Sequence, residues 1–78
     1  MPTILRLFGL VFMIFTRDHK PPHVHVRNQD GEAKFRVTVD EVSLIENCGM
    51  KTKDLRLAES ILEDNKQFVV EQWVKIHG

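Results

Sequence analysis

A short segment in the first half of the chain carries most of the side chains that could do chemistry. It reads Asp18-His19-Lys20-Pro21-Pro22-His23-Val24-His25-Val26-Arg27. Side chains two positions apart on a strand point to the same face of the sheet, so His23 and His25 are expected to lie together. Because histidine titrates near neutral pH, two imidazoles can divide acid and base roles. In this interpretation the carboxylate of Asp18 orients one of them.

Cations on the following strand would add phosphate contacts to the same face. Residues 23–27 and 32–39 both alternate between apolar and polar types, and the four residues 28–31 between them are typical of a hairpin turn. A two-residue turn would pair His25 with Arg36, whereas a four-residue loop would pair it with Lys34. Both registers keep the same faces because they differ by an even shift. One face is therefore predicted to hold His23, His25, Arg27, Lys34 and Arg36, and the other Val24, Val26, Ala33, Phe35, Val37 and Val39.

Three uses of the polar face stay open from the residues alone. The first is cleavage of a phosphodiester without a metal or other cofactor, in which His23, His25 and Asp18 are catalytic and the three cations stabilise the anionic transition state. The second is a metal site with ligands from His19, His23 and His25, or with Asp18 as the third ligand. The third is structural: the histidines cap a solvated face, or bond Asp18 and so fix the loop. The same cations could also simply hold phosphates, without catalysis.

The elements that must position these residues follow from the change in period along the chain. Residues 3–8 and 10–15 predict two strands joined by a tight turn at Gly9, and residues 42–46 predict a further short strand. From Thr52, the expected N-cap, apolar residues recur at helical spacing, as one helix or as two with a bend near residues 63–66. The predicted stripe is Leu55, Ala58, Ile61, Leu62, Phe68, Val69, Trp73 and Ile76, and the aromatic core residues are Phe8, Phe12, Phe15 and Phe35. The expected fold is α+β: a small antiparallel, hairpin-rich sheet packed against a C-terminal helix or helix pair.

Size and composition restrict the class of protein. The 78 residues allow one domain, mainly β-sheet over 1–47 and helical over 52–77, and a single cysteine excludes a disulfide framework. The net charge is zero, but residues 1–39 carry six cations and three anions, whereas residues 40–78 carry five cations and eight anions. The apolar run over residues 7–15 is too short to span a bilayer and is expected to form core strands of a cytoplasmic protein without membrane contact.

The chain resembles a bacterial family known as domain of unknown function 4160. The resemblance covers essentially the whole chain and rests on Met1-Pro2-Thr3-Ile4-Leu5-Arg6, on Asp18-His19 followed by Pro21-Pro22-His23-Val24-His25-Val26, and on Gly31-Glu32-Ala33-Lys34-Phe35. The family often has a third proline where Lys20 stands, and this departure bears only on how rigid the loop is expected to be.

Members of that family look like small proteins encoded beside another small protein, in what resemble type II toxin–antitoxin pairs. The resemblance therefore implies a toxin-like protein with a small cognate protein encoded nearby as its partner. Together with the basic sheet face, it gives the expectation of a toxin-like protein that binds RNA and could cleave it without a metal. The alternative is a non-enzymatic protein-binding module, antitoxin or adaptor, which would use the helical stripe and the acidic second half. A homodimer through the C-terminal helix is a further expectation.

Overall fold

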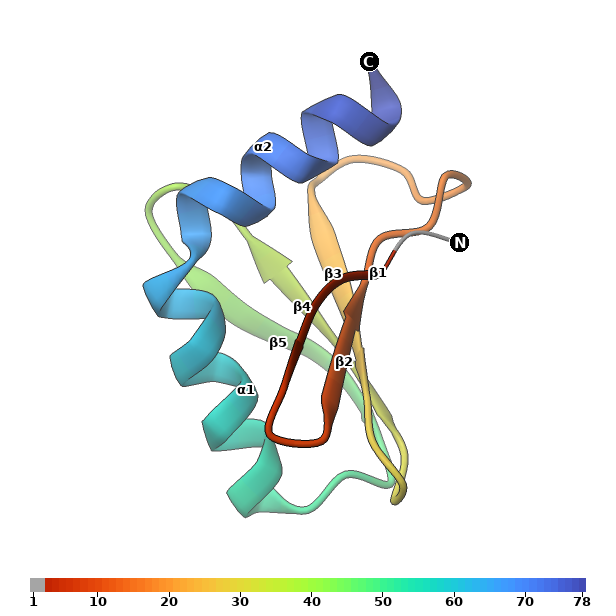
Figure 1. The fold of residues 1–78 in the computed structure, drawn as a ribbon, viewed down its shortest axis with the longest axis vertical. Helices are drawn as coiled ribbons and strands as arrows, with labels where there is room; N and C mark the ends of the chain where they lie inside the picture. The colour runs from red at the N-terminus through yellow and green to blue at the C-terminus, as the bar shows by residue number, and fades with distance from the viewer. Residues whose placement is uncertain (1–2) are drawn as a thin grey trace.

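The protein folds as a five-stranded antiparallel sheet followed by two helices (Figure 1). A computed structural model describes residues 3–78. The strands pair in chain order and comprise β1 (Thr3–Leu7), β2 (Leu10–Met13), β3 (His23–Arg27), β4 (Glu32–Val37) and β5 (Val42–Cys48). The helices are α1 (Thr52–Asp64) and α2 (Lys66–His77). The α+β fold expected from the sequence, with a helix pair on the sheet, is confirmed.

A tight turn joins β1 to β2. Phe8 and Gly9 both have positive φ, at 51° and 76°, which matches the right-handed twist of a two-residue hairpin. The prediction of a turn at Gly9 is therefore confirmed. The prediction that Phe8 belongs to the core is wrong, because the turn directs this side chain outward and leaves it 76% exposed.

A four-residue loop joins β3 to β4 and sets the register of the candidate site. The Asn28 side chain holds this loop, because its Oδ1 accepts the backbone N–H groups of Asp30 and Gly31 at 2.9 and 3.1 Å. The strands then pair His23 with Arg36, His25 with Lys34 and Arg27 with Glu32. This is the second of the two registers that the sequence allowed.

The strand β4 ends earlier than the alternating pattern suggests. The Thr38 hydroxyl accepts the backbone N–H of Glu41 at 3.1 Å, and the Thr38 N–H donates to the carbonyl of Glu41, so the chain turns here. Val39 lies in this turn and is 61% exposed, which corrects its predicted place on the apolar face. The next strand, β5, extends two residues beyond the predicted end to Cys48.

The two helices cover the apolar face of the sheet. Lys51, not Thr52, is the N-cap of α1, and its side chain makes no capping hydrogen bond. The helices meet at Asn65, which confirms a break within residues 63–66 and rules out a single helix. The core contains Leu10, Phe12, Ile14, Val24, Val26, Ala33, Phe35, Val37, Val42, Met50, Ala58, Ile61, Leu62, Val69 and Trp73. Most of the predicted stripe is therefore used in the core, although Phe68 is 37% exposed.

The second helix also reaches past the end of the sheet. In Figure 1 the C-terminal part of α2 passes over the loop between β2 and β3, which places the last residues of the chain close to the candidate site. Within residues 3–78, neither helix is long and apolar enough to cross a membrane.

Candidate functional site

The loop between β2 and β3 turns back on itself and aims the carboxylate of Asp18 at the sheet. The backbone N–H of Phe15 donates to Asp18 Oδ2 at 3.0 Å, and the N–H of Asp18 donates to the carbonyl of Phe15 at 3.1 Å. At the other end of the loop, the N–H of Val37 in β4 donates to the carbonyl of Pro22 at 3.1 Å. Both ends of the loop are thus bonded to backbone, so the carboxylate has a defined position.

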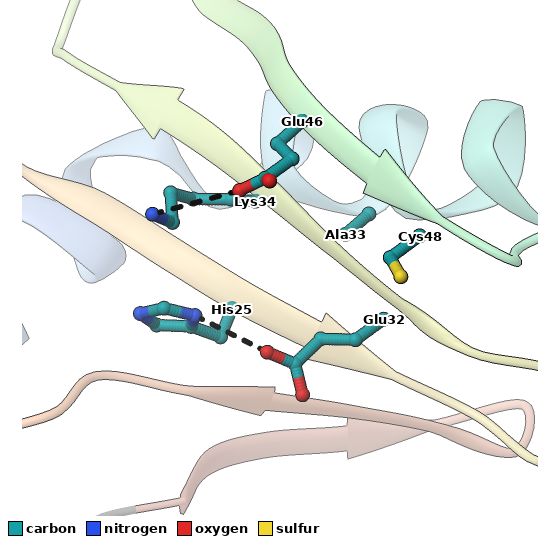
Figure 2. Close-up of a pocket in the computed structure, with 6 residues that line it drawn as sticks. All are labelled: His25, Glu32, Ala33, Lys34, Glu46 and Cys48. Atoms are coloured by element: carbon teal, nitrogen blue, oxygen red, sulfur yellow. Dashed lines mark ion pairs between the residues drawn. The ribbon is translucent and has the colours of Figure 1, made fainter.

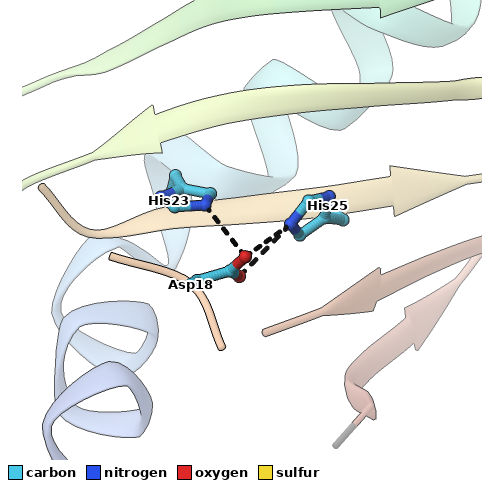
Figure 3. Close-up of side chains that lie close together, drawn as sticks. All are labelled: Asp18, His23 and His25. Atoms are coloured by element: carbon cyan, nitrogen blue, oxygen red, sulfur yellow. Dashed lines mark hydrogen bonds and ion pairs between the residues drawn. The ribbon is translucent and has the colours of Figure 1, made fainter. Parts of the chain in front are cut away.

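Asp18, His23 and His25 form one compact cluster (Figure 3). His23 Nε2 lies 3.3 Å from Asp18 Oδ1, and His25 Nε2 lies 3.2 Å from each oxygen of the same carboxylate. The three side chains are only 12%, 11% and 13% exposed for His23, His25 and Asp18. The structure therefore brings together the three residues that the sequence singled out as catalytic, and their chemical roles stay predictions.

The other ring nitrogen of each histidine also faces an oxygen. His23 Nδ1 lies 2.9 Å from the carbonyl oxygen of Pro21, and His25 Nδ1 lies 3.5 Å from Glu32 Oε2. A carbonyl oxygen only accepts hydrogen bonds, so His23 Nδ1 carries the hydrogen. Both rings are fixed from two sides, and both turn Nε2 toward Asp18.

Aromatic side chains pack around the two imidazoles. The ring of Phe15 lies edge-on to His25 with centroids 4.4 Å apart, and the indole of Trp73 in α2 lies 5.3 Å from the ring of His23. Trp73 also stacks on His77 at 3.8 Å. The C-terminal helix therefore packs against the cluster as well as the core, whereas the apolar pattern of its sequence indicated the core and a surface for a second copy.

The surroundings of Asp18 favour its charged form. Burial raises the pKa of the carboxyl. The hydrogen bond from the Phe15 N–H and the positive charge that His25 and His23 can carry lower this pKa, and together they outweigh burial. The result is a pKa below the ordinary value of 3.8. Asp18 is therefore an anion throughout the neutral range.

The face of the sheet that the helices do not cover carries charges of both signs. A pocket of about 400 Å³ lies beside the cluster and is lined by His25, Glu32, Ala33, Lys34, Glu46 and Cys48 (Figure 2). Lys34 Nζ lies 3.9 Å from Glu46 Oε1, and Glu32 faces His25. The sequence interpretation named only the cations and imidazoles of this face, although Glu32 has the same strand parity as Lys34 and Arg36.

The remaining candidate residues are more exposed. Arg27 and Arg36 are exposed on the uncovered face, and Arg27 Nη2 donates to the sulfur of Met13 at 3.4 Å. Among residues 3–78, neither arginine has a carboxylate within ion-pair distance. His19 is exposed and stands outside the cluster. Of the two ligand sets that the sequence allowed, the structure gathers the one in which Asp18 is the third donor, with donor atoms within 4.8 Å of one another.

Comparisons with known proteins identify a family and nothing beyond it. The family model described as "Domain of unknown function (DUF4160)" matches residues 9–74. This match covers most of the chain, which therefore belongs to that family. No curated protein and no solved structure matches the chain.

Proposed function

For this member of the DUF4160 family, we propose a role as an RNA-binding, toxin-like component of a two-protein module. The observation that carries this proposal is the position of Arg27 and Arg36. Both are exposed on the face of the sheet that the helices leave uncovered, and Arg36 pairs across the strands with His23 of the cluster. Phosphate groups held by these guanidinium groups would bring an RNA backbone next to Asp18, His23 and His25.

The charges on this face limit the strength of the expected binding. Lys34 faces Glu46, and Glu32 stands opposite Arg27, so two carboxylates oppose the three cations. Two to three phosphate contacts to single-stranded RNA weaken binding by about 7- to 18-fold between 50 and 200 mM salt. The protein should therefore bind RNA measurably at low salt and weakly at physiological salt.

The test is binding of a short, labelled, single-stranded RNA of mixed sequence, followed by fluorescence anisotropy at both salt concentrations. The variant Arg27→Ala/Arg36→Ala should bind at least tenfold more weakly and lose most of the salt dependence. A matched control is Lys53→Ala/Arg56→Ala, which removes two exposed cations from α1 and should bind like the wild type. Equal loss in both double variants, or a response that does not change with salt, would refute specific phosphate binding by the uncovered face.

The toxin-like part of the proposal rests on the family resemblance and is tested in cells. Induction of the wild-type protein should arrest growth, and co-expression of the neighbouring small protein should relieve the arrest. The Arg27→Ala/Arg36→Ala variant should not arrest growth at an equal soluble level. RNA integrity measured in the same cultures reports whether binding is accompanied by cleavage, which the sequence assigned to His23 and His25. If the variant arrests growth as strongly as the wild type, toxicity does not depend on RNA binding by these two arginines.

A further inference from the structure

The hydrogen bonds around the two imidazoles determine what can lie between them and Asp18. The Nδ1 atom of His23 donates to the Pro21 carbonyl, and the Nδ1 atom of His25 faces the carboxylate of Glu32, which accepts in its ionised form. In a neutral ring with its hydrogen on Nδ1, Nε2 carries an unshared electron pair. His23 offers such a pair to Asp18, and His25, which hydrogen-bonds Asp18 through Nε2, offers one when its hydrogen is on Nδ1 toward Glu32.

The neutral imidazole of His23 has no hydrogen to place between its Nε2 and the carboxylate of Asp18, because its hydrogen is on Nδ1. A positive charge between Nε2 and the carboxylate oxygen 3.3 Å away would remove the repulsion between their electron pairs. Protons on the imidazoles could supply that charge, and so could a bound cation. We propose that Asp18, His23 and His25 bind a divalent transition-metal ion of the zinc class.

The distances from the carboxylate to the two imidazoles fit this assignment. Zinc binds imidazole nitrogen and carboxylate oxygen at about 2.0–2.1 Å, so neighbouring ligands in a tetrahedral site stand about 3.3 Å apart. The two nitrogen-to-oxygen distances in the cluster are 3.3 and 3.2 Å. Two imidazoles and one carboxylate are also a ligand set that divalent first-row metals accept, with a fourth position left for water or another molecule.

The surroundings of the cluster have the features of a prepared metal site. Imidazole ligands usually donate their second N–H to a backbone carbonyl or a carboxylate, and Pro21 and Glu32 provide one of each. The Phe15 N–H holds the third ligand, Asp18, in position. The aromatic rings of Phe15 and Trp73 cover the imidazoles and limit the access of water.

Metal binding at this cluster goes beyond the proposed RNA binding and does not depend on it. A bound ion would occupy both Nε2 atoms and so replace the acid–base pair that the sequence suggested for His23 and His25. The phosphate contacts of Arg27 and Arg36 would not change. Zinc affinity and RNA affinity are therefore measured separately, and either proposal can fail alone.

The experiment is a zinc titration of the full chain after removal of any affinity tag and treatment with a chelator. Calorimetry should give close to one Zn²⁺ per chain. The melting temperature should rise by roughly 10–20 °C at a zinc concentration one hundred times the Kd. Cobalt(II) bound in place of zinc should show the visible absorption of a four-coordinate site. If zinc does not bind in a stoichiometric amount, the three side chains are held together by hydrogen bonds without a metal ion, and the proposal is overturned.

Variants identify the ligands. Asp18→Asn and His23→Gln should each weaken zinc binding at least a hundredfold, and Glu32→Gln should weaken it about 10- to 100-fold through the orientation of His25. His19→Gln is the matched control, because this exposed histidine is next to Asp18 in the chain and should leave the affinity unchanged. Circular dichroism in chelator shows which variants fold, and only folded variants are compared. Wild-type affinity in folded His23→Gln or Glu32→Gln, or its loss in His19→Gln, would refute the assigned ligands.

Discussion

Replacing Asp18 by asparagine removes the negative charge of the cluster while keeping the shape of the side chain. The amide oxygen can still accept the Phe15 N–H, but it offers no charge to His23 and His25, whose Nε2 atoms lie 3.2–3.3 Å from the carboxylate. A hydrogen bond to a charged group contributes about 1.5–3 kcal/mol when well made. Because these two contacts are long, we expect Asp18→Asn to lower the free energy of unfolding by about 2 kcal/mol in chelator at pH 5.

The pH dependence of this effect has a definite sign. The pKa of Asp18 is lower in the folded protein than its ordinary value of 3.8. The stability that Asp18 contributes is therefore fully present above 3.8 and is lost as the pH falls through the lower, folded-state pKa. The asparagine variant has no carboxyl to titrate at this position. The two proteins should thus differ most near pH 5 and converge as the pH falls well below 3.8.

The measurement is thermal unfolding by circular dichroism across this range, with chelator present. For a domain of this size, a loss of about 2 kcal/mol corresponds to a melting temperature about 8–16 °C lower at pH 5. Asp40→Asn is the control, because Asp40 is exposed in the turn after β4 and the substitution should change stability by less than about 0.5 kcal/mol. Equal stability of wild type and Asp18→Asn at pH 5 would refute the electrostatic argument. So would a difference that persists unchanged well below pH 3.8.

Two further substitutions test the framework around the cluster. Gly31→Ala should lower the free energy of unfolding by about 3 kcal/mol, because a Cβ there would overlap the backbone carbonyl of Cys48 in the neighbouring strand. Its control, Gly9→Ala, meets nothing within 4 Å and should cost only about 1–2 kcal/mol through its positive φ; similar urea midpoints for both would contradict this. Trp73→Ala should cost about 3–5 kcal/mol and leave the chain largely unfolded at 25 °C. Trp73→Phe should fold, and amide NMR should show shifted resonances at His23; an unchanged spectrum there would contradict the contact with α2.

The local elements could be predicted because short-range patterns determine them. Alternation at His23 to Arg27 fixed which side chains share a face, and the turn residues 28–31 restricted the register to two choices. Where the pattern failed, a turn was responsible. Phe8 continues an apolar run but occupies a turn position, and Val39 continues an alternation that the Thr38–Glu41 turn interrupts.

The assembly of the cluster could be predicted only in part. Asp18 was a candidate because it is close to the histidines in sequence, but its contacts depend on the backbone bonds of the loop that turns it back. The contact between Trp73 and His23 joins residues fifty positions apart, and nothing in the local sequence indicates it. Glu46 lies opposite Lys34 because the pairing of β4 with β5 shifts register between Lys34 and Phe35. The periodicity of the sequence does not indicate such a shift.

The free-energy cost of burying three polar side chains in the cluster is itself an argument that the cluster has a function. A domain of this length draws no more than about 3–5 kcal/mol of stability from its core. Each polar group that is withdrawn from water without full compensation costs about 1–3 kcal/mol. Asp18, His23 and His25 are all nearly buried, and apolar side chains at the same three positions would pack against Phe15 and Trp73 without that cost. The meeting of three nearly buried polar side chains, a folded loop and the end of a helix at one point therefore supports the proposal that this point binds a metal ion.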